Sequence, residues 1–322
     1  MLGLALLVWQ SLDRDKLVVY CAHDAVFAEA ILRDFEKQTG IPVAVKFDTE
    51  ATKSLGLAEQ IIREAAHPRC DVFWNNELLG TLDLAERGLL APHKGAGWQR
   101  IPAQFRDPEG HWTGFAARLR VIIERSDAPP WNERLINSRD LTRFAMAKPL
   151  YGTTLTHYTV LWHDWGAARL KEWHTDARRR GLVELPGNAQ TKNSVAKGMC
   201  DAAFTDTDDF FEAKDEGSPV TMHPAQLENG QTICIPNTVA IIRNGPHAEN
   251  ARKLADFLLS AKTELALACS LSRQIPLGPV DDAQIPAEVR DLLPHVARGY
   301  PLTSLLKSRN ECLAWLKGEY LK

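Results

Sequence analysis

The densest group of side chains able to do chemistry is the segment Thr205–Asp209, which reads TDTDD. It follows the apolar stretch DAAF and precedes a predicted helix that begins near Phe210. Three carboxylates at one helix start exceed what capping requires. Asp206, Thr207 and Asp208 are therefore predicted to face a binding cleft, where carboxylates hold a cation, an amine or sugar hydroxyls. The alternative is a solvated group in which one aspartate caps the helix.

Two further polar groups come directly after predicted strands. His23 and Asp24 follow one apolar strand, and Asn75, Asn76 and Glu77 follow the buried stretch CDVFW. In open α/β sheets, ligands bind beyond the carboxyl ends of the strands. We therefore expect these five side chains to contact a ligand. Asp24 has a second interpretation, as the cap of the following helix.

Hydroxyl-rich segments at two predicted helix starts offer oxygen and N–H groups to an anion. Thr49 and Ser54 belong to the segment TEATKS, and Thr153 and Thr154 belong to a Gly-Thr-Thr turn before the helix that carries His157. The turn lacks the Walker lysine pattern, so nucleotide binding of the P-loop type is not supported. An ordinary capping segment is the alternative interpretation of both.

Arg118 and Arg120 lie close together on a long predicted strand, FAARLRVIIE. We expect the two side chains to point to opposite sides of the sheet, so that only one of them, Arg120, faces the cleft. The alternative for an arginine between two lobes is a structural ion pair with a carboxylate.

Composition narrows the class of protein. The 322 residues, 45% hydrophobic and 25% charged, are enough for two compact globular domains. A formal net charge of -3 provides no basic field for nucleic acid. The six cysteines form no CxxC pair, which argues against zinc knuckles and redox pairs. We predict no cofactor and leave metal binding undetermined.

Alternating strand and helix patterns position these residues. The strand Leu17–Cys21 leads into a helix over Ala25–Gln38, and a strand at Pro42–Phe47 completes a βαβ unit. Two long apolar strands, Phe115–Glu124 and Ile233–Ile242, lie far apart in sequence and are predicted to cross between lobes. The expected fold is α/β with two lobes, a hinge and an interlobe ligand cleft.

The predicted division assigns residues 16–115 plus 240–280 to the first lobe and residues 116–239 plus 281–322 to the second. Residues 1–15 are expected to be the remnant of a signal or a membrane anchor. Their apolar run, Leu2–Trp9, is far shorter than the roughly 20 residues that span a bilayer. It fits the apolar part of a secretion signal, and a frayed N-terminal helix is the alternative.

Eight segments in a fixed order carry a likeness to a known family: LVVYCAHD, FEKQTGIPVAV, CDVFWNNE, RGLLAP, GFAARLRVIIE, DAAFTDTDD, PNTVAII and SRQIPLGP. From about Leu17 to Pro279 the chain resembles the periplasmic ferric-iron-type binding proteins of ABC importers, within extracellular solute-binding protein family 1. The resemblance implies the type II periplasmic binding protein fold. It also implies a monomer in the periplasm or cell envelope, with a small-molecule or ion ligand, a membrane permease as partner and no catalysis.

The resemblance also implies ligand positions. Ferric members hold the metal with two adjacent tyrosines of the second lobe, and many add a histidine and a glutamate from the first. His23 matches the histidine, and Asn76 or Glu77 falls where the glutamate stands. The tyrosine pair is replaced by Phe210 and Phe211, which offer no phenolate oxygen for a hard cation. Relatives of the broader class carry organic and phosphorylated solutes, so the resemblance implies a small organic or phosphorylated anion as ligand, with metal bound by other ligands as the alternative.

Two other classes of function stay open at this stage. An α/β enzyme working in the same cleft could use His23 and Asp206 as an acid–base couple, but no nucleophile stands out. The sequence contains no GxSxG, HExxH, Walker A or GxGxxG motif. A sensor domain with the binding-protein fold is the other alternative, although nothing in the chain adds a signalling module.

Overall fold

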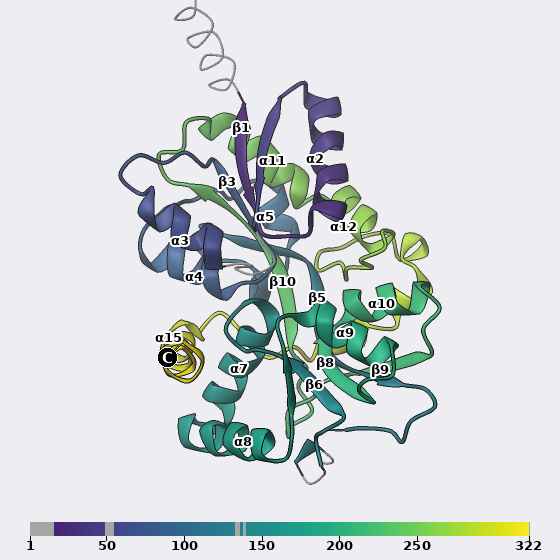
Figure 1. The fold of residues 1–322 in the computed structure, drawn as a ribbon. Coiled ribbons are helices and arrows are strands. Elements are labelled where there is room, and N and C mark those ends of the chain that lie inside the picture. The colour runs from purple at the N-terminus through teal and green to yellow at the C-terminus, as the bar shows by residue number, and fades with distance from the viewer. Residues whose placement is uncertain (1–15, 49–54, 133–135, 138–139, 322) are drawn as a thin grey trace, which may run out of the picture.

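The computed structural model describes residues 16–48, 55–132, 136–137 and 140–321. Figure 1 shows two α/β lobes joined by long strands, so the expected two-lobed α/β architecture is confirmed. Within the described residues, no helix is long and apolar enough to cross a bilayer. The N-terminal segment expected to be a signal or anchor lies outside this part of the chain, as do Thr49 and Ser54.

Parallel strands form the centre of the first lobe. β1 (Leu17–Cys21) lies between β2 (Val43–Phe47) and β3 (Val72–Asn75) and runs parallel to both. The apolar side chains of β1 and β3 are buried on both faces because helices cover the sheet. The other elements of this lobe are α2 (Ala25–Thr39), α3 (Leu55–Arg63), α4 (Leu79–Glu86), β4 (Leu90–Ala91), α5 (Ala96–Arg100), a 3-10 turn (Ala103–Phe105), α11 (Ala248–Leu258) and α12 (Ala261–Ala268).

Helix α2 shows how local sequence sets an element that borders the cleft. Ala28, Ile31, Leu32 and Phe35 recur at helical spacing and form its buried face. The helix ends at Gly40, whose φ of 71° is accessible to glycine and whose N–H donates to the carbonyl of Glu36 at 2.8 Å. The helix expected over Ala25–Gln38 is confirmed, with one more residue before Gly40.

Two long strands connect the lobes. β5 (Thr113–Arg125) pairs antiparallel with β10 (Cys234–Ile242) along its first part and with β8 (Ala202–Asp206) along its second part. β10 also pairs with β3 in the first lobe. Both strands therefore run through both lobes, as expected. The exact residue boundaries of the two lobes stay a prediction.

Both connecting strands are irregular at the same level of the molecule. The register of β10 against β5 shifts between Ile235 and Asn237, where Pro236 removes one ladder donor. On β5, Ala116 has a φ of 43°, which is uncommon for a residue with a Cβ. The buried Glu264 accepts the N–H of Ala116 at 2.7 Å, and the Asn237 side chain donates to its carbonyl.

The second lobe repeats the parallel arrangement. β6 (Phe144–Ala147) lies between β7 (Val183–Leu185) and β8, parallel to both, while β9 (Val220–Pro224) pairs antiparallel with β5. The helices of this lobe are α7 (Gly152–Trp165), α8 (Ala167–Arg179), α9 (Asn188–Ala196) and α10 (Thr207–Asp215). The Gly-Thr-Thr turn expected before the helix that carries His157 instead forms the first turn of α7.

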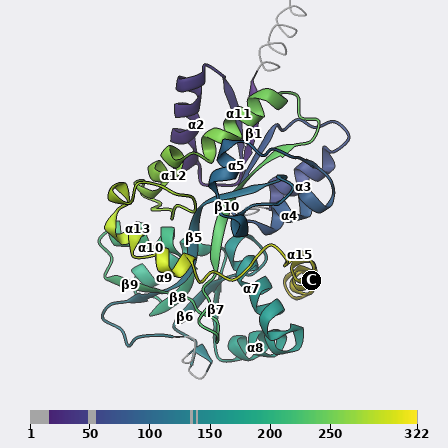
Figure 2. The same ribbon diagram turned by 180° about the vertical axis from the view of Figure 1, so that it is seen from behind.

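The chain ends with short helices and one long one. After a 3-10 turn (Asp282–Gln284) come α13 (Ala287–Arg290) and α14 (Leu293–Val296), followed by α15 (Leu306–Tyr320). The segment before α15 crosses in front of the connecting strands in Figure 2, which views the molecule from behind. α15 packs mainly on α7 and also touches α4, so the last helix contacts both lobes.

Candidate functional site

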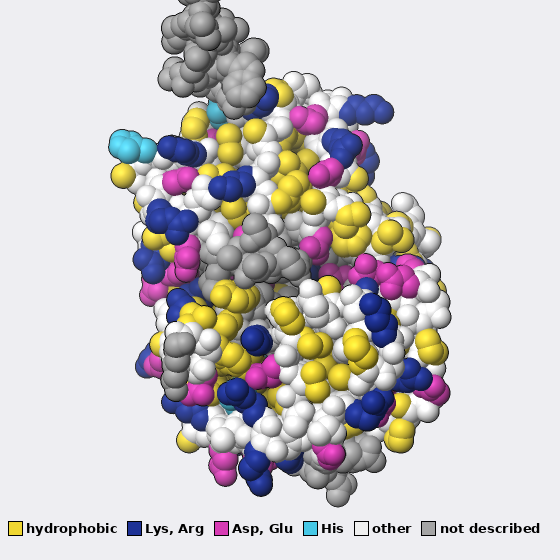
Figure 3. Space-filling model, in the orientation of Figure 1, with side chains coloured by type: hydrophobic (Ala, Val, Ile, Leu, Met, Phe, Trp, Pro, Cys, Tyr) yellow, Lys and Arg dark blue, Asp and Glu magenta, His cyan; other side chains and the backbone are white. Residues whose placement is uncertain are grey.

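A cavity of about 420 Å³ lies between the two lobes. Its first-lobe wall is the start of α2 together with Asn76 at the end of β3, and its second-lobe wall is made by the first turns of α7, α9 and α10. These helices start beyond the carboxyl ends of their preceding strands, the place where open α/β sheets bind ligands. Acidic side chains gather at one side of the waist between the lobes (Figure 3).

The first-lobe wall combines polar and apolar groups. Asp24, Val26, Phe27 and Asn76 line it. Val26 is 72% exposed although it stands beside a cavity, so its side chain is available to a ligand or to the opposite lobe on closure. This wall can therefore contact both hydroxyl or amine groups and hydrocarbon.

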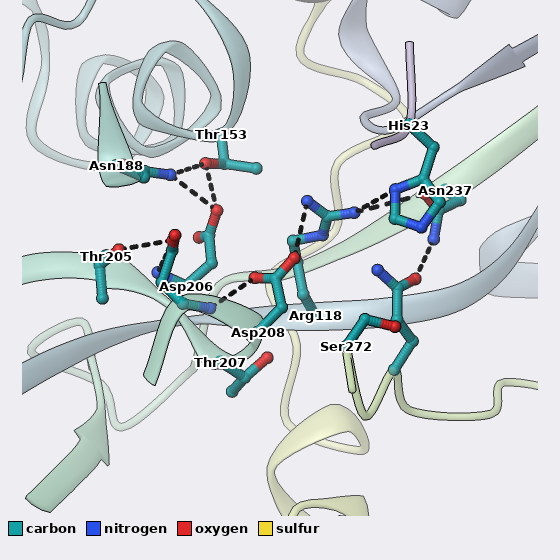
Figure 4. Close-up of polar contacts among 12 residues, drawn as sticks. His23, Arg118, Thr153, Asn188, Thr205, Asp206, Thr207, Asp208, Asn237 and Ser272 are labelled. Carbon is teal, nitrogen blue, oxygen red and sulfur yellow. Dashed lines mark hydrogen bonds and ion pairs between the residues drawn. The ribbon is translucent and has the colours of Figure 1, made fainter. Parts of the chain in front are cut away.

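Arg118 connects the two walls. Its Nη1 lies 3.3 Å from Oδ2 of Asp208 in the second lobe, and its Nη2 lies 3.3 Å from Nδ1 of His23 and 3.4 Å from Oδ1 of Asn237 (Figure 4). Burial by itself would lower the pKa of Arg118, but the carboxylates of Asp208 and Asp206 outweigh it and raise the pKa. Arg118 is thus a permanent cation on the cavity wall.

Arg120 belongs to a second, deeper network. Its Nη1 lies 2.8 Å from Oδ1 of Asp206, which is the N-cap residue of α10. The other oxygen of Asp206 accepts from Thr153 Oγ1 at 2.6 Å and from Asn188 Nδ2 at 2.8 Å. One buried carboxylate therefore ties together the starts of α7, α9 and α10 (Figure 4).

The expectation that Arg118 and Arg120 point to opposite sides of the sheet is wrong. Residues two positions apart on a strand share a face, and both arginines bind carboxylates of the same helix start. Arg118 lines the cavity, whereas Arg120 is completely buried behind Asp206 and does not appear in the wall. Arg120 therefore has the structural ion pair that was the alternative interpretation.

The three aspartates of the TDTDD segment have different surroundings. Asp206 and Asp209 form a capping box at the start of α10, and Asp209 also accepts from Thr205 Oγ1 at 2.6 Å. Asp208 faces Arg118. Oxygen atoms of the three lie within 4.8 Å of one another, the spacing of a possible cation site. Two arginines already supply the positive charge there.

The backbone N–H groups at the starts of α7 and α9 differ from those of α10, because no side chain caps them. Neither helix has a side-chain cap, although Thr153 and Thr154 occupy the first turn of α7, and Asn188 and Ala189 open α9. Among the described residues, the backbone N–H groups of these four positions have no hydrogen-bond partner. All four residues line the cavity. Lys148, also on the wall, forms no ion pair with a described side chain.

Several residues expected at the site lie elsewhere. Glu77 does not line the cavity: it accepts the N–H groups of Leu79 and Gly80 at the start of α4, and burial raises its pKa. Asn75 is buried against Glu77 and Thr81.

Three more expected residues are buried outside the cavity wall. Thr207 accepts the N–H of Leu119 at 3.3 Å. His157 lines a different cavity, in the second lobe. His23 is buried behind the wall against Arg118. The expected residues that do line the cavity are Asp24, Asn76, Thr153, Thr154, Asp206 and Asp208. Their contact with a ligand stays a prediction.

The tyrosines do not gather at the cavity. All five fall within the described residues, and only Tyr151 lies on its wall. Phe210 and Phe211, which the resemblance puts in the place of the tyrosine pair of ferric members, are buried in the first turns of α10. The guanidinium of Arg273 lies 5.1 Å from the centre of the Phe211 ring. This position therefore serves packing.

Reasoning from the sequence missed several residues of the wall, among them Arg118, Asn188 and Lys148. Arg118 was passed over in favour of Arg120 because of the mistaken face assignment. Asn188 follows the Pro-Gly pair at 186–187, a turn signal directly before a helix that could have marked it. Lys148 follows strand β6, and its position after a buried strand was the available signal.

A family model and individual known proteins were found to be similar to this chain. The profile described as "Bacterial extracellular solute-binding protein" matches residues 17–268. The "Fe(3+)-binding periplasmic protein" of Serratia marcescens is 26% identical over 107 residues, 33% of this chain and 30% of that protein. The "Iron uptake protein A2" of Synechocystis sp. is 23% identical over 234 residues, 63% of this chain and 64% of that protein. These matches span less than two thirds of both relatives.

Solved structures share the fold over nearly the whole chain. Iron-bound HitA from Pseudomonas aeruginosa superposes with a TM-score of 0.80 at 21% identity, covering 94% of this chain and 98% of that one. AfuA from Actinobacillus pleuropneumoniae, with fructose-6-phosphate bound, gives a TM-score of 0.75 at 16% identity, covering 94% and 98%. At these identities the likeness concerns the fold.

Proposed function

The chain belongs to the bacterial extracellular solute-binding proteins, and from this premise we propose that it is the binding component of an ABC importer for a small organic phosphate or phosphonate. The ligand is held in the interlobe cavity, outside the inner membrane, and delivered to a permease. A relative of the same fold holds fructose-6-phosphate, which supports a phosphorylated solute as ligand.

The observation that carries the proposal is the pair of uncapped helix starts at α7 and α9. Their free N–H groups and their helix dipoles favour a bound anion. The ammonium of Lys148 lies on the same wall, whereas the hydroxyls of Thr153 and Thr154 already donate to Asp206 and Asn188. A tetrahedral anion has enough acceptor oxygens to satisfy several of these donors together.

The acidic side chains of the wall do not oppose this assignment, because most already have cationic or N–H partners. Asp206 is compensated by Arg120, and Asp208 by Arg118. Glu212 pairs with Lys192 at 3.0 Å. The organic end of the ligand then faces Asp24 and Asn76 of the first lobe, which favour hydroxyl or amine groups. We infer a ligand with one anionic end and one hydroxyl-bearing or amine-bearing end.

The same contacts disfavour direct binding of ferric iron. A hard cation requires anionic oxygen ligands. Tyr151 is the one tyrosine on the wall, and the nearby aspartates are paired with arginines. His23, at the position of the family's histidine ligand, has its Nδ1 next to the guanidinium of Arg118. A bound trivalent ion would have to approach that guanidinium.

Closure of the lobes follows from the two connecting strands. The irregularities at Ala116 on β5 and at Pro236 on β10 stand at one level, so a change of a few backbone angles there reorients the lobes. Closing brings Val26 and Asn76 toward the helix starts of the second lobe, and shields the ligand from water.

Isothermal titration calorimetry tests the proposed function with 2-aminoethylphosphonate, glycerol 3-phosphate, fructose 6-phosphate, glycerol and ferric citrate. We expect saturable binding of at least one phosphorus compound and none of glycerol, since glycerol lacks the anionic end. Tight binding of iron together with no binding of any phosphorus compound would overturn the proposal.

An enzyme acting in the same cavity is distinguished by turnover. We expect phosphorus NMR to show the bound ligand chemically unchanged after prolonged incubation with the protein. Release of inorganic phosphate that scales with protein concentration would instead assign a hydrolase to this cavity, since a binding protein leaves its ligand intact.

A further inference from the structure

The second lobe contains another cavity, of about 230 Å³, separate from the interlobe one. It lies between α7 and β8: His157, Leu161 and Trp165 come from α7, and Phe204 comes from β8. Trp173 of α8 closes one side. Phe204 and Asp206 on the same strand line the second and first cavity respectively, so the two spaces are neighbours.

Aromatic rings dominate the wall of this second cavity. The imidazole of His157 packs edge-on against Phe204, with ring centres 4.9 Å apart and planes at 86°. Trp165 and Trp173 pack in the same manner, with ring centres 6.1 Å apart. These rings offer faces and edges to a flat hydrocarbon ligand, and Asn137, Gln226 and Glu228 add polar groups to the wall.

Two polar groups of this wall lack partners. Nδ1 of His157 and Nε1 of Trp165 are buried, and neither has a hydrogen-bond partner among the described residues. Burial, with the nearby charge of Arg120 as a lesser cause, holds the pKa of His157 well below its usual value. The imidazole is therefore neutral and able to accept a hydrogen bond from a hydroxyl. A buried polar group without a partner is costly unless a ligand or water satisfies it.

We propose that the second cavity binds a small uncharged phenol, with its hydroxyl on His157 and its ring packed between Phe204, Leu161 and the two tryptophans. The volume of about 230 Å³ accommodates one substituted aromatic ring. His157 and Trp165 stand eight residues apart on α7, about 12 Å along the helix axis, so one hydroxyl reaches only one of them. The hydroxyl is assigned to His157, which is able both to accept and to donate.

The proposal is tested with p-cresol and toluene, which differ by one hydroxyl. Binding is followed in 1H–15N spectra through the Trp165 indole N–H signal, assigned with the variant Trp165→Phe. We expect saturable binding of p-cresol at least fivefold tighter than that of toluene. In His157→Phe the hydroxyl partner is lost while the ring contact to Phe204 remains, so the two affinities become equal.

Two matched substitutions locate the binding. Ala225 lies on the wall, and Ala225→Met fills the space and is expected to weaken p-cresol at least tenfold. Ala168→Met, at an exposed position of α8, is expected to leave p-cresol affinity unchanged. An Ala189→Glu substitution at the interlobe cavity also leaves it unchanged, which separates the two sites. Circular dichroism and thermal unfolding establish that each variant is folded.

Absence of saturable p-cresol binding to the wild type would overturn the proposal. So would undiminished binding to folded Ala225→Met, or a preference for p-cresol that persists in His157→Phe. If Ala225→Met does not fold, the comparison of p-cresol with toluene in His157→Phe decides the matter alone.

Discussion

The guanidinium of Arg118 lies 3.3 Å from Nδ1 of His23, a contact that joins the connecting strand to the first lobe. The same guanidinium lies 3.3 Å from Asp208 of the second lobe. One buried side chain thus contacts a residue of each lobe beside the interlobe cavity (Figure 4). Because these contacts depend on the relative position of the lobes, the proposed ligand binding and closure would both act on Arg118.

Removal of Arg118 is expected to destabilise the protein. In Arg118→Met, Asp208 loses its buried cationic partner, and the free energy of unfolding in urea falls by about 3 kcal/mol. The control Arg33→Met removes an exposed pair with Glu29 and changes that free energy by less than about 0.5 kcal/mol. Equal effects of the two substitutions would contradict a buried ion pair at Arg118.

A carboxylate placed at the start of α9 is expected to weaken ligand binding without lowering the thermal stability of the protein. Ala189→Glu puts a negative charge on an uncapped helix start, so thermal stability is expected to stay equal or rise by about 0.5 kcal/mol. The same charge repels an anionic ligand, and calorimetry should show the affinity for the best phosphorus compound reduced at least tenfold. The matched control Ala248→Glu, at the exposed start of α11, should leave affinity unchanged. Retained affinity in Ala189→Glu would remove α9 from the anion site.

Among the carboxylates outside the cavity, Glu264 is the one whose replacement is expected to lower the unfolding free energy most. It is completely buried, pairs with Arg100, and accepts the N–H groups of Ala116, Leu277 and Gly278. Glu264→Gln replaces an acceptor by an N–H donor that faces other donors, and should lower the unfolding free energy by about 3 kcal/mol.

A matched exposed carboxylate provides the comparison. Glu249→Gln, which breaks an exposed pair with Arg252, is expected to change the unfolding free energy by less than about 0.5 kcal/mol. A loss below about 1 kcal/mol in Glu264→Gln, measured by denaturant unfolding, would contradict the assigned role of Glu264 in holding Ala116.

The pH dependence of stability contains a contribution from His157. Its pKa is lowered by burial in the folded state from an ordinary value of 6.5, so the unfolded chain binds the proton more tightly. Stability is then lost as the pH falls below about 6.5, by up to about 1.4 kcal/mol per pH unit from this group. In His157→Phe the unfolding free energy should therefore fall less between pH 7 and pH 5.

The comparison is made by urea unfolding at several pH values. The unfolding free energy of His157→Phe still falls as the pH falls, because burial lowers the pKa of His174 as well. Parallel pH profiles for the wild type and His157→Phe would show that His157 does not carry this contribution.

Much of the site could be anticipated because it follows local rules. Asp24, Asn76, Thr153 and Asp206 each come directly after a predicted strand or at a predicted helix start, and parallel strands bring such positions to one edge. These rules do not show whether a side chain at that edge faces the cavity or accepts backbone N–H groups of the helix that follows it. Glu77 does so, and caps α4 instead of facing the cavity.

The sequence by itself determined the periodic features: the βαβ order, the helix that ends at Gly40 and the two strands that cross between the lobes. These depend on hydrophobic spacing and on glycine conformation, which are properties of neighbouring residues. Only the tertiary structure decided that Arg118 lines the cavity, that Arg120 locks three helix starts through Asp206, and that His157 belongs to a second cavity. Those outcomes depend on partners contributed by distant segments, and spacing along one strand or helix carries no information about them.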